Sequence, residues 1–142
     1  RVLTAAGFAV VACDDRPGTL TPEWVPNVYD RRLVDYKNLS ERCPIGPRDL
    51  VVVATAGHKS DIDVVIQAMR AKPAYLGCLG SRRKTAFVRA RLEQEGFTQE
   101  QIDELHLPIG VAIEAEDPEE IAISIAAEMI HLRRTKLIPR KR

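Results

Sequence analysis

The chain has 142 residues, 45% of them hydrophobic, and a formal net charge of +1. This length and composition suit one domain with one hydrophobic core, and the small net charge argues against a protein that binds nucleic acid or another polyanion. The apolar runs are too short for a membrane-spanning helix, so we also expect no membrane association.

The N-terminal part of the chain predicts a helix end, a strand and a turn. Residue 1 is Arg rather than Met, and residues 1–6 have the pattern of a helix that ends at Gly7. We therefore expect a fragment of a longer protein, in which the strand and loop before this helix are missing. Residues 8–15 (FAVVACDD) predict a buried strand, and Thr21 followed by Pro22 predicts a short helical turn.

The middle of the chain predicts two strands that are each followed by a helix. Residues 27–48 are ambiguous, and one interpretation places a short strand near residue 28 and a helical turn over residues 36–42. The rest follows apolar periodicity: a strand over 49–57, a helix over 60–71, a strand over 74–80 and a helix over 81–94. In the last of these helices we expect Phe87, Val88 and Leu92 to point inward.

The C-terminal third predicts two more helices. Thr98 and Gln101 are spaced for a capping box at the start of a short helix. Residues 106–110 (HLPIG) predict a connector or a short strand. A longer helix follows, with Asp117 as its N-cap and Pro118 as its first residue. Its expected core face carries Ile121, Ile125, Met129 and Leu132.

Apolar strands that alternate with helices predict parallel βαβ units. The expected fold class is therefore α/β, with a doubly wound parallel sheet in a single domain over residues 1–142. Ligands of such sheets bind beyond the carboxyl ends of the strands. Three strand ends become candidate sites: residues 13–15, 55–58 and 78–81.

The most informative of these strand ends is the one at Gly80. Ser81 is placed to cap the next helix, and Arg82, Arg83 and Lys84 fill the first turn of that helix. The free N–H groups of a helix N-terminus carry positive partial charge, so three cations there are unfavourable unless an anion lies among them. We expect a phosphate or a pterin-type phosphate or carboxylate, held by backbone N–H groups and basic side chains together. The alternative is that the three side chains extend into solvent.

The first strand ends in two acids, Asp14 and Asp15. In a dinucleotide-binding fold, an acid at the end of the second strand accepts hydrogen bonds from a ribose diol. The two acids occupy that place if the partial helix before them is the first crossover helix. The alternative is that they only cap the turn that follows.

The remaining strand end carries Gly57 and His58. Gly57 permits a ligand to approach the backbone closely, and His58 stands where it could bind an anion, ligate a metal or transfer a proton. A purely structural imidazole is equally consistent with the pattern, and Asp61 is placed to orient it. His106 and His131 lie outside the strand ends, so we expect them to be structural or on the surface.

The three cysteines, Cys13, Cys43 and Cys78, form neither a CxxC motif nor a zinc-binding spacing. Their odd number and the lack of a signal sequence predict a reduced, cytoplasmic protein. Cys13 and Cys78 would both lie near the ligand edge, where two thiols could bind a soft metal or carry sulfur. Buried cysteines are more often inert core residues, and the sequence leaves any metal undetermined.

Charges are segregated along the chain. Residues 58–92 contain eight Lys or Arg and two Asp, whereas residues 93–128 contain eleven Asp or Glu and no Lys or Arg. This pattern predicts a basic functional face and a separate acidic face, unless the two sets intermix in the fold.

Five segments resemble the C-terminal Rossmann-like domain of the XdhC family, the accessory proteins of xanthine dehydrogenase and related molybdenum hydroxylases. The segments are VVACDDRP (10–17), VVVATAGHKSD (51–61), YLGCLGSRRK (75–84), LPIG (107–110) and EEIAISIAAE (119–128). The motifs GSRRK and EIAxSIAAE are the most specific of them. The resemblance implies a Rossmann-like, three-layer fold that lacks here its first strand and Gly-rich loop.

The resemblance also implies a function. Such a protein binds molybdenum cofactor (molybdopterin), helps its sulfuration and delivers it to a xanthine dehydrogenase-type apoenzyme, as a chaperone rather than as a catalyst. The sequence itself shows no set of nucleophile, base and orienting residue, and its apolar final helix is compatible with a homodimer. The cofactor-binding positions that the resemblance implies are Asp14, Asp15, Gly57, His58, Gly80, Ser81, Arg82, Arg83 and Lys84.

Two other functions remain open at this point. The sheet pattern and the two acids at the first strand end also fit an NAD(P)-dependent oxidoreductase domain. The acidic segment over residues 93–128 also fits an interaction module that docks a partner through charge complementarity.

Overall fold

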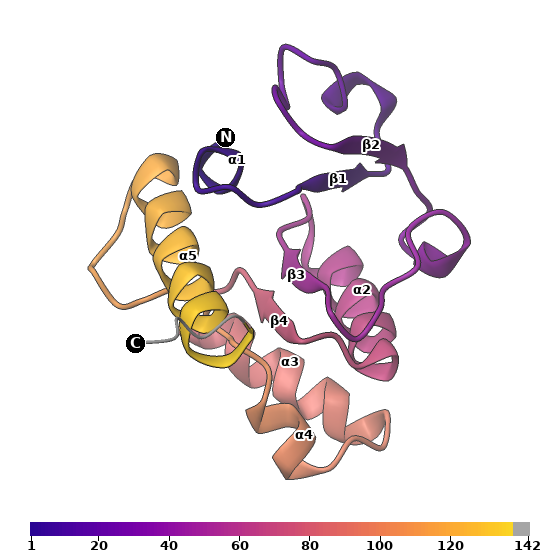
Figure 1. The fold of residues 1–142 in the computed structure, drawn as a ribbon. Helices are drawn as coiled ribbons and strands as arrows, with labels where there is room; N and C mark the ends of the chain where they lie inside the picture. The colour runs from indigo at the N-terminus through magenta and orange to yellow at the C-terminus, as the bar shows by residue number, and fades with distance from the viewer. Residues whose placement is uncertain (138–142) are drawn as a thin grey trace.

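The computed structural model describes residues 1–137 and contains two parallel strand pairs (Figure 1). The pairs are β1 (Val11–Asp14) with β2 (Asp30–Leu33), and β3 (Leu50–Val53) with β4 (Tyr75–Cys78). The expectation of a parallel α/β arrangement is confirmed. The strands nevertheless form two separate two-stranded sheets within the described residues, whereas the sequence predicted one continuous sheet.

Helices connect and cover the strands at the predicted places. They are α1 (Val2–Ala5), α2 (His58–Ala71), α3 (Arg82–Gln94), α4 (Gln99–Asp103) and α5 (Pro118–Leu132), with short 3-10 turns η1 (Pro17–Thr19) and η2 (Leu39–Glu41) and a π-helical turn η3 (Arg133–Leu137). The predicted capping box at Thr98 is formed, and Asp117 is the N-cap of α5 as predicted, with its backbone N–H donating to the Glu120 carboxylate at 3.3 Å. Gly7 follows the end of α1 with φ +79°. Among residues 1–137, none of the helices combines the length and the apolar character needed to cross a membrane.

The β3–β4 pair lies between two layers of helices, because alternate side chains point to opposite faces of a strand. Val51 and Val53 join the apolar cluster that contains the inner faces of α2 and α3. Leu50 and Val52 join a second cluster, which is formed mainly by α5 and the N-terminal segment. Figure 1 shows α2 and α5 on opposite sides of this strand pair. Helices thus cover both faces of the β3–β4 pair.

The connector over residues 106–110 lies beside β4 and forms backbone hydrogen bonds with it. The backbone N–H of Cys78 donates to the carbonyl of His106 at 2.9 Å, and the N–H of Ile109 donates to the carbonyl of Cys78 at 3.1 Å. Gly77 is required here because a Cβ atom at this position would overlap the side chains of Ile109 and Tyr75. The sheet therefore extends past β4 toward α5.

The carboxylate of Glu128 on α5 links β4 and the connector to this helix. It accepts hydrogen bonds from the Tyr75 hydroxyl at 2.8 Å and from the Gly110 backbone N–H at 2.7 Å, and His106 Nδ1 lies 2.5 Å from its other oxygen. Burial alone would raise the pKa of Glu128, but the three polar contacts outweigh burial and lower it. His106 is therefore a structural residue, as predicted.

The prediction that Phe87 points into the core is wrong. Phe87 is 57% exposed, whereas Val88 and Leu92 are fully buried. The buried stripe of α3 runs through Lys84, Val88 and Leu92 at four-residue intervals. Because Lys84 takes the inward position of the first turn, the next turn presents Val88 to the core and leaves Phe87 outside.

We expect Gly77→Ala to destabilise the domain by about 1–3 kcal/mol, since the added methyl group must displace Ile109 and Tyr75 in a packed core. The matched control is Gly18→Ala, where a Cβ atom meets no other atom within 4 Å. The free energies of unfolding from urea titrations would contradict this expectation if the two variants were equally stable.

Glu128→Gln should destabilise the domain by about 1–3 kcal/mol near neutral pH, because a carboxamide cannot replace all the contacts of the carboxylate. A lowered folded-state pKa means that this stabilisation is present above the unfolded-state pKa of about 4.3 and is lost as the pH falls through the folded value. The difference in unfolding free energy between wild type and variant should therefore shrink from pH 5 to pH 3. A difference that stays constant over this interval would refute the assignment.

Candidate functional site

The first turn of α3 is built as its sequence predicts. Ser81 is the N-cap in extended conformation, and its hydroxyl oxygen accepts from the Lys84 backbone N–H at 3.4 Å. Arg82 and Arg83 are the first two residues of the helix, and no acidic residue lies in this turn. Arg83 is exposed, whereas the role predicted for the Arg82 side chain lies outside what the structure describes. The turn therefore presents backbone N–H groups and at least one exposed cation.

The first turn of α2 has the opposite character. The helix begins at His58 after an extended Gly57 and carries Asp61 in its first turn. Asp61 is only 2% exposed, and its Oδ1 accepts from the backbone N–H and the hydroxyl of Thr55, both at 2.8 Å. A carboxylate at this place is favoured by the positive end of the helix dipole. The part predicted for the His58 side chain lies outside the described residues.

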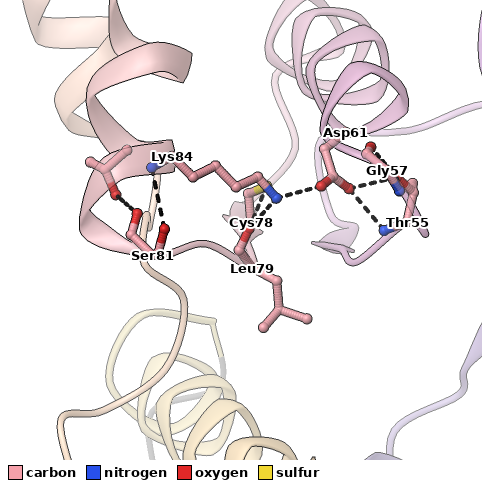
Figure 2. A network of polar contacts seen from close by, with 8 residues as sticks. Thr55, Gly57, Asp61, Cys78, Leu79, Ser81 and Lys84 are labelled. Carbon is pink, nitrogen blue, oxygen red and sulfur yellow. Dashed lines mark hydrogen bonds and ion pairs between the residues drawn. The ribbon is translucent and has the colours of Figure 1, made fainter.

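Lys84 joins the two turns, as Figure 2 shows. Its ammonium group forms an ion pair with Asp61 Oδ2 and donates to the Leu79 carbonyl at 2.5 Å. Both side chains are almost fully buried. The positive charge of Lys84, one of the three cations in this turn, is therefore neutralised by a carboxylate of the protein itself. From the sequence we expected Lys84 to face a ligand, and Asp61 was not identified as its partner. The position of Asp61 on the apolar face of α2 is the signal that could have indicated this pair.

The two predicted glycines have different roles. At Gly80, a Cβ atom would lie 2.9 Å from Leu107 Cδ1 and 3.1 Å from Lys84 Cδ, so the glycine leaves room for the stem of Lys84. At Gly57, a Cβ atom would meet nothing within 4 Å. The backbone at the entrance of α2 is therefore open to an approaching group.

The two predicted acids lie apart from this arrangement. The carboxylate of Asp14 accepts from the side chain of Arg16 through both oxygens at 3.0 Å, and this hydrogen-bonded guanidinium lowers the pKa of Asp14. Asp15 is half-exposed and lies 3.9 Å from Arg16 Nε. Nearby, burial together with the charges of the two acids raises the pKa of Tyr36 to about 12. Among the side chains that the structure describes, which exclude those of His58 and Arg82, no hydrogen bond or ion pair links Asp14 or Asp15 to the turns at Gly57 and Gly80.

The sequence predicted that Cys13 and Cys78 both lie near the ligand edge, but the structure places Cys13 against a different cysteine. Cys78 is buried under the basic turn, and burial raises the pKa of its thiol to about 11. Cys13 instead lies against Cys43, with 3.2 Å between the two sulfur atoms. No spacing motif in the sequence relates Cys43 to Cys13. Among the residues that the structure describes, no three His, Cys, Asp or Glu side chains gather closely enough to hold a metal ion.

The segregated charges partly intermix in the fold. Arg89 on α3 forms an ion pair with Asp103 on α4, and Glu95 lies 2.8 Å from Arg91 and 3.1 Å from Arg70. The expected separation into a basic and an acidic face is therefore incomplete, because the second half of α3 is paired with acids of the following segment. The basic turn at the start of α3 lies outside these pairs.

A cavity of about 700 Å³ opens at the opposite edge of the β3–β4 pair. It lies before the amino end of β4 and is lined by residues of both charge signs, among them Lys72, Lys136, Asp103 and Glu104. Ligands of open α/β sheets bind at the carboxyl edge of the strands. We therefore assign the candidate site to the turns at Gly57 and Gly80, on geometry and charge.

The chain is similar to known proteins over most of its length. It is 32% identical over 128 residues to an uncharacterized protein of Escherichia coli K12, YqeB, and 29% identical over 105 residues to the molybdenum cofactor insertion chaperone PaoD of the same organism. These alignments cover 89% and 74% of this chain but only 23% and 33% of the relatives.

The solved structures include a similar fold at comparable identity. A crystal structure described as a xanthine dehydrogenase from Bacillus halodurans superimposes with a TM-score of 0.81 and 29% identity, over 99% of this chain and 40% of that one. The model of the XdhC Rossmann domain matches residues 1–129. The chain therefore belongs to the XdhC family, in which it corresponds to the Rossmann domain.

Proposed function

We propose that this domain binds molybdenum cofactor through its phosphate group at the paired first turns of α2 and α3, and that it delivers the cofactor to a xanthine dehydrogenase-type apoenzyme. The observation that carries the proposal is the buried ion pair between Lys84 and Asp61, which holds two helix N-termini together at the carboxyl edge of β3 and β4.

The electrostatics of this edge favour an anion. The free N–H groups at the start of α2 and α3 carry positive partial charge, and both helices are long enough, at 14 and 13 residues, to have a substantial dipole. Asp61 does not cancel this field at the surface, because its charge is buried and already paired with Lys84. Arg83 adds an exposed positive charge beside the turn. A phosphate here would receive backbone and guanidinium hydrogen bonds together.

The role of each predicted residue can be specified further. The free backbone N–H groups at the starts of α2 and α3, beside Gly57 and Ser81, would contact the phosphate, and the exposed Arg83 would supply positive charge at the rim. Lys84 acts as a positioning residue, because its ammonium group is engaged by Asp61 and the Leu79 carbonyl. Asp14 and Asp15 lie at the end of another strand pair, so we assign them to recognition of a more distant part of a ligand.

One relative supports a role in cofactor handling. It is a molybdenum cofactor insertion chaperone, and a similar solved structure is described as a xanthine dehydrogenase. This chain spans between about a quarter and two-fifths of these proteins. Delivery to an apoenzyme is therefore proposed for the domain as part of such an assembly.

Replacement of Arg83 by Ala should weaken the binding of molybdenum cofactor by about tenfold or more, because one charge-assisted hydrogen bond to a phosphate is worth about 1.5–3 kcal/mol. Arg91→Ala removes a cation from the same helix that already pairs with Glu95, and it should leave the affinity unchanged. Equilibrium titration of the two variants measures the difference. A parallel titration with NADPH tests the oxidoreductase alternative, and tighter binding of NADPH than of molybdenum cofactor would contradict the proposal.

Lys84→Met should destabilise the domain by about 3–5 kcal/mol, since it leaves the buried Asp61 carboxylate without its counter-charge. The double variant Lys84→Met, Asp61→Asn should cost much less than the sum of the two single changes, because no unpaired charge remains. Because the ion pair sets the relative position of the two turns, the well-folded double variant should bind molybdenum cofactor more weakly than wild type. Unchanged affinity in a well-folded double variant would contradict the positioning role of the pair.

A further inference from the structure

Two cysteines that are 30 positions apart in the sequence lie against each other at the end of β1. The Sγ atoms of Cys13 and Cys43 are 3.2 Å apart, and both residues are partly exposed. Cys13 belongs to β1 and is held by pairing with β2, in register with Arg32. Cys43 follows η2, where its backbone N–H donates to the Leu39 carbonyl at 2.8 Å. Both thiols are thus fixed by backbone hydrogen bonds in adjacent segments.

The surroundings of the pair favour a thiolate at Cys43. The Cys13 thiol donates to the Cys43 sulfur, and the Arg32 guanidinium adds positive charge, so the pKa of Cys43 is lowered to about 6 although burial opposes the shift. The same hydrogen bond and burial raise the pKa of Cys13. The charge of Asp30 raises the pKa of Cys13 further, whereas the charge of Asp49 opposes the lowering of the pKa of Cys43. Arg32 itself is held by Asp30 at 2.8 Å.

We propose that Cys13 and Cys43 form a redox-active dithiol, which is oxidised to an intramolecular disulfide by exchange with a small disulfide such as oxidised glutathione. The proposal is independent of cofactor binding, because it rests on the contact between the two sulfur atoms and their backbone anchoring. Disulfide geometry requires the sulfur atoms to approach to about 2.05 Å. The two sulfur atoms, now 3.2 Å apart, must therefore approach each other by about 1 Å.

The exchange proceeds in two steps that conserve atoms and electrons. The Cys43 thiolate attacks one sulfur of the small disulfide, which forms a mixed disulfide at Cys43 and releases one small thiolate. Cys13 then loses its proton, and its sulfur attacks the Cys43 sulfur, which forms the Cys13–Cys43 bond and releases the second small thiolate. Two electrons pass from the dithiol to the small disulfide, and the protons lost by the two cysteines end on the two small thiols.

The bond would fasten β1 to the connector between β2 and β3. Cys13 directly precedes Asp14, and the connector also carries Tyr36, whose hydroxyl lies close to the acids at this strand end. The oxidised form would therefore have a more rigid end of β1. Cys78 takes no part, because it is fully buried in the core next to Lys84.

The proposal is tested by equilibrating the folded protein with glutathione at several ratios of oxidised to reduced form, followed by acid quenching and peptide mass spectrometry. We expect one intramolecular disulfide that joins the peptides of Cys13 and Cys43, with Cys78 free. The oxidised protein should melt about 5–15 °C higher than the reduced protein, as expected for a bond that closes a loop of this length. Absence of the Cys13–Cys43 bond at every ratio, or a bond to Cys78, would overturn the proposal.

Single variants separate this chemistry from general thiol reactivity. Cys13→Ser should accumulate a mixed disulfide with glutathione at Cys43, because the resolving thiol is missing, and Cys78→Ser should behave as wild type. The rate of alkylation at Cys43 in wild type should reach half of its maximum near pH 6, and this midpoint should rise in Cys13→Ser. Equal alkylation rates for Cys43 and Cys78 in the folded wild type would contradict the assignment.

Discussion

The buried ion pair between Lys84 and Asp61 is the interaction on which the candidate site depends. Each charge alone would be very costly in the interior, so the two residues must remain in contact whenever the domain is folded. Their contact fixes the first turn of α3 against the first turn of α2, and the additional bonds to Thr55 and the Leu79 carbonyl tie both turns to the ends of β3 and β4. The geometry of the edge thus follows from one pair of side chains.

The same pair changes how the basic turn is understood. A lysine in the first turn of a helix opposes the helix dipole, and in isolation it would weaken α3. Here the opposing charge comes from the neighbouring helix, where a carboxylate is favoured at the equivalent position. The unfavourable placement of Lys84 on its own helix is offset by the favourable placement of Asp61 on the other. What remains for an external anion is the outer part of the turn, including Arg83.

Features that depend on local chemistry could be predicted from the sequence. The N-caps at Ser81, Thr98 and Asp117 involve hydrogen bonds over three residues, and the strand–helix alternation around β3 and β4 follows apolar periodicity. Features that depend on distant partners could not. The inward position of Lys84 required Asp61, 23 positions away, and the Cys13–Cys43 contact spans 30 positions without a motif. The division of the strands into two pairs also lacks a local signal, because periodicity predicts strands but not their neighbours.

The ion pairs along α3 have a consequence for how an anion reaches the domain. Arg89 and Arg91 are paired with Asp103 and Glu95, so the distal half of the helix contributes little to the long-range potential. The positive field is therefore concentrated at one end of α3, although the net charge of the chain is only +1. Such a localised field orients an incoming phosphate without attracting polyanions over the whole surface. Its range is about 8–10 Å at physiological ionic strength, so the orientation takes place during the last stage of the encounter.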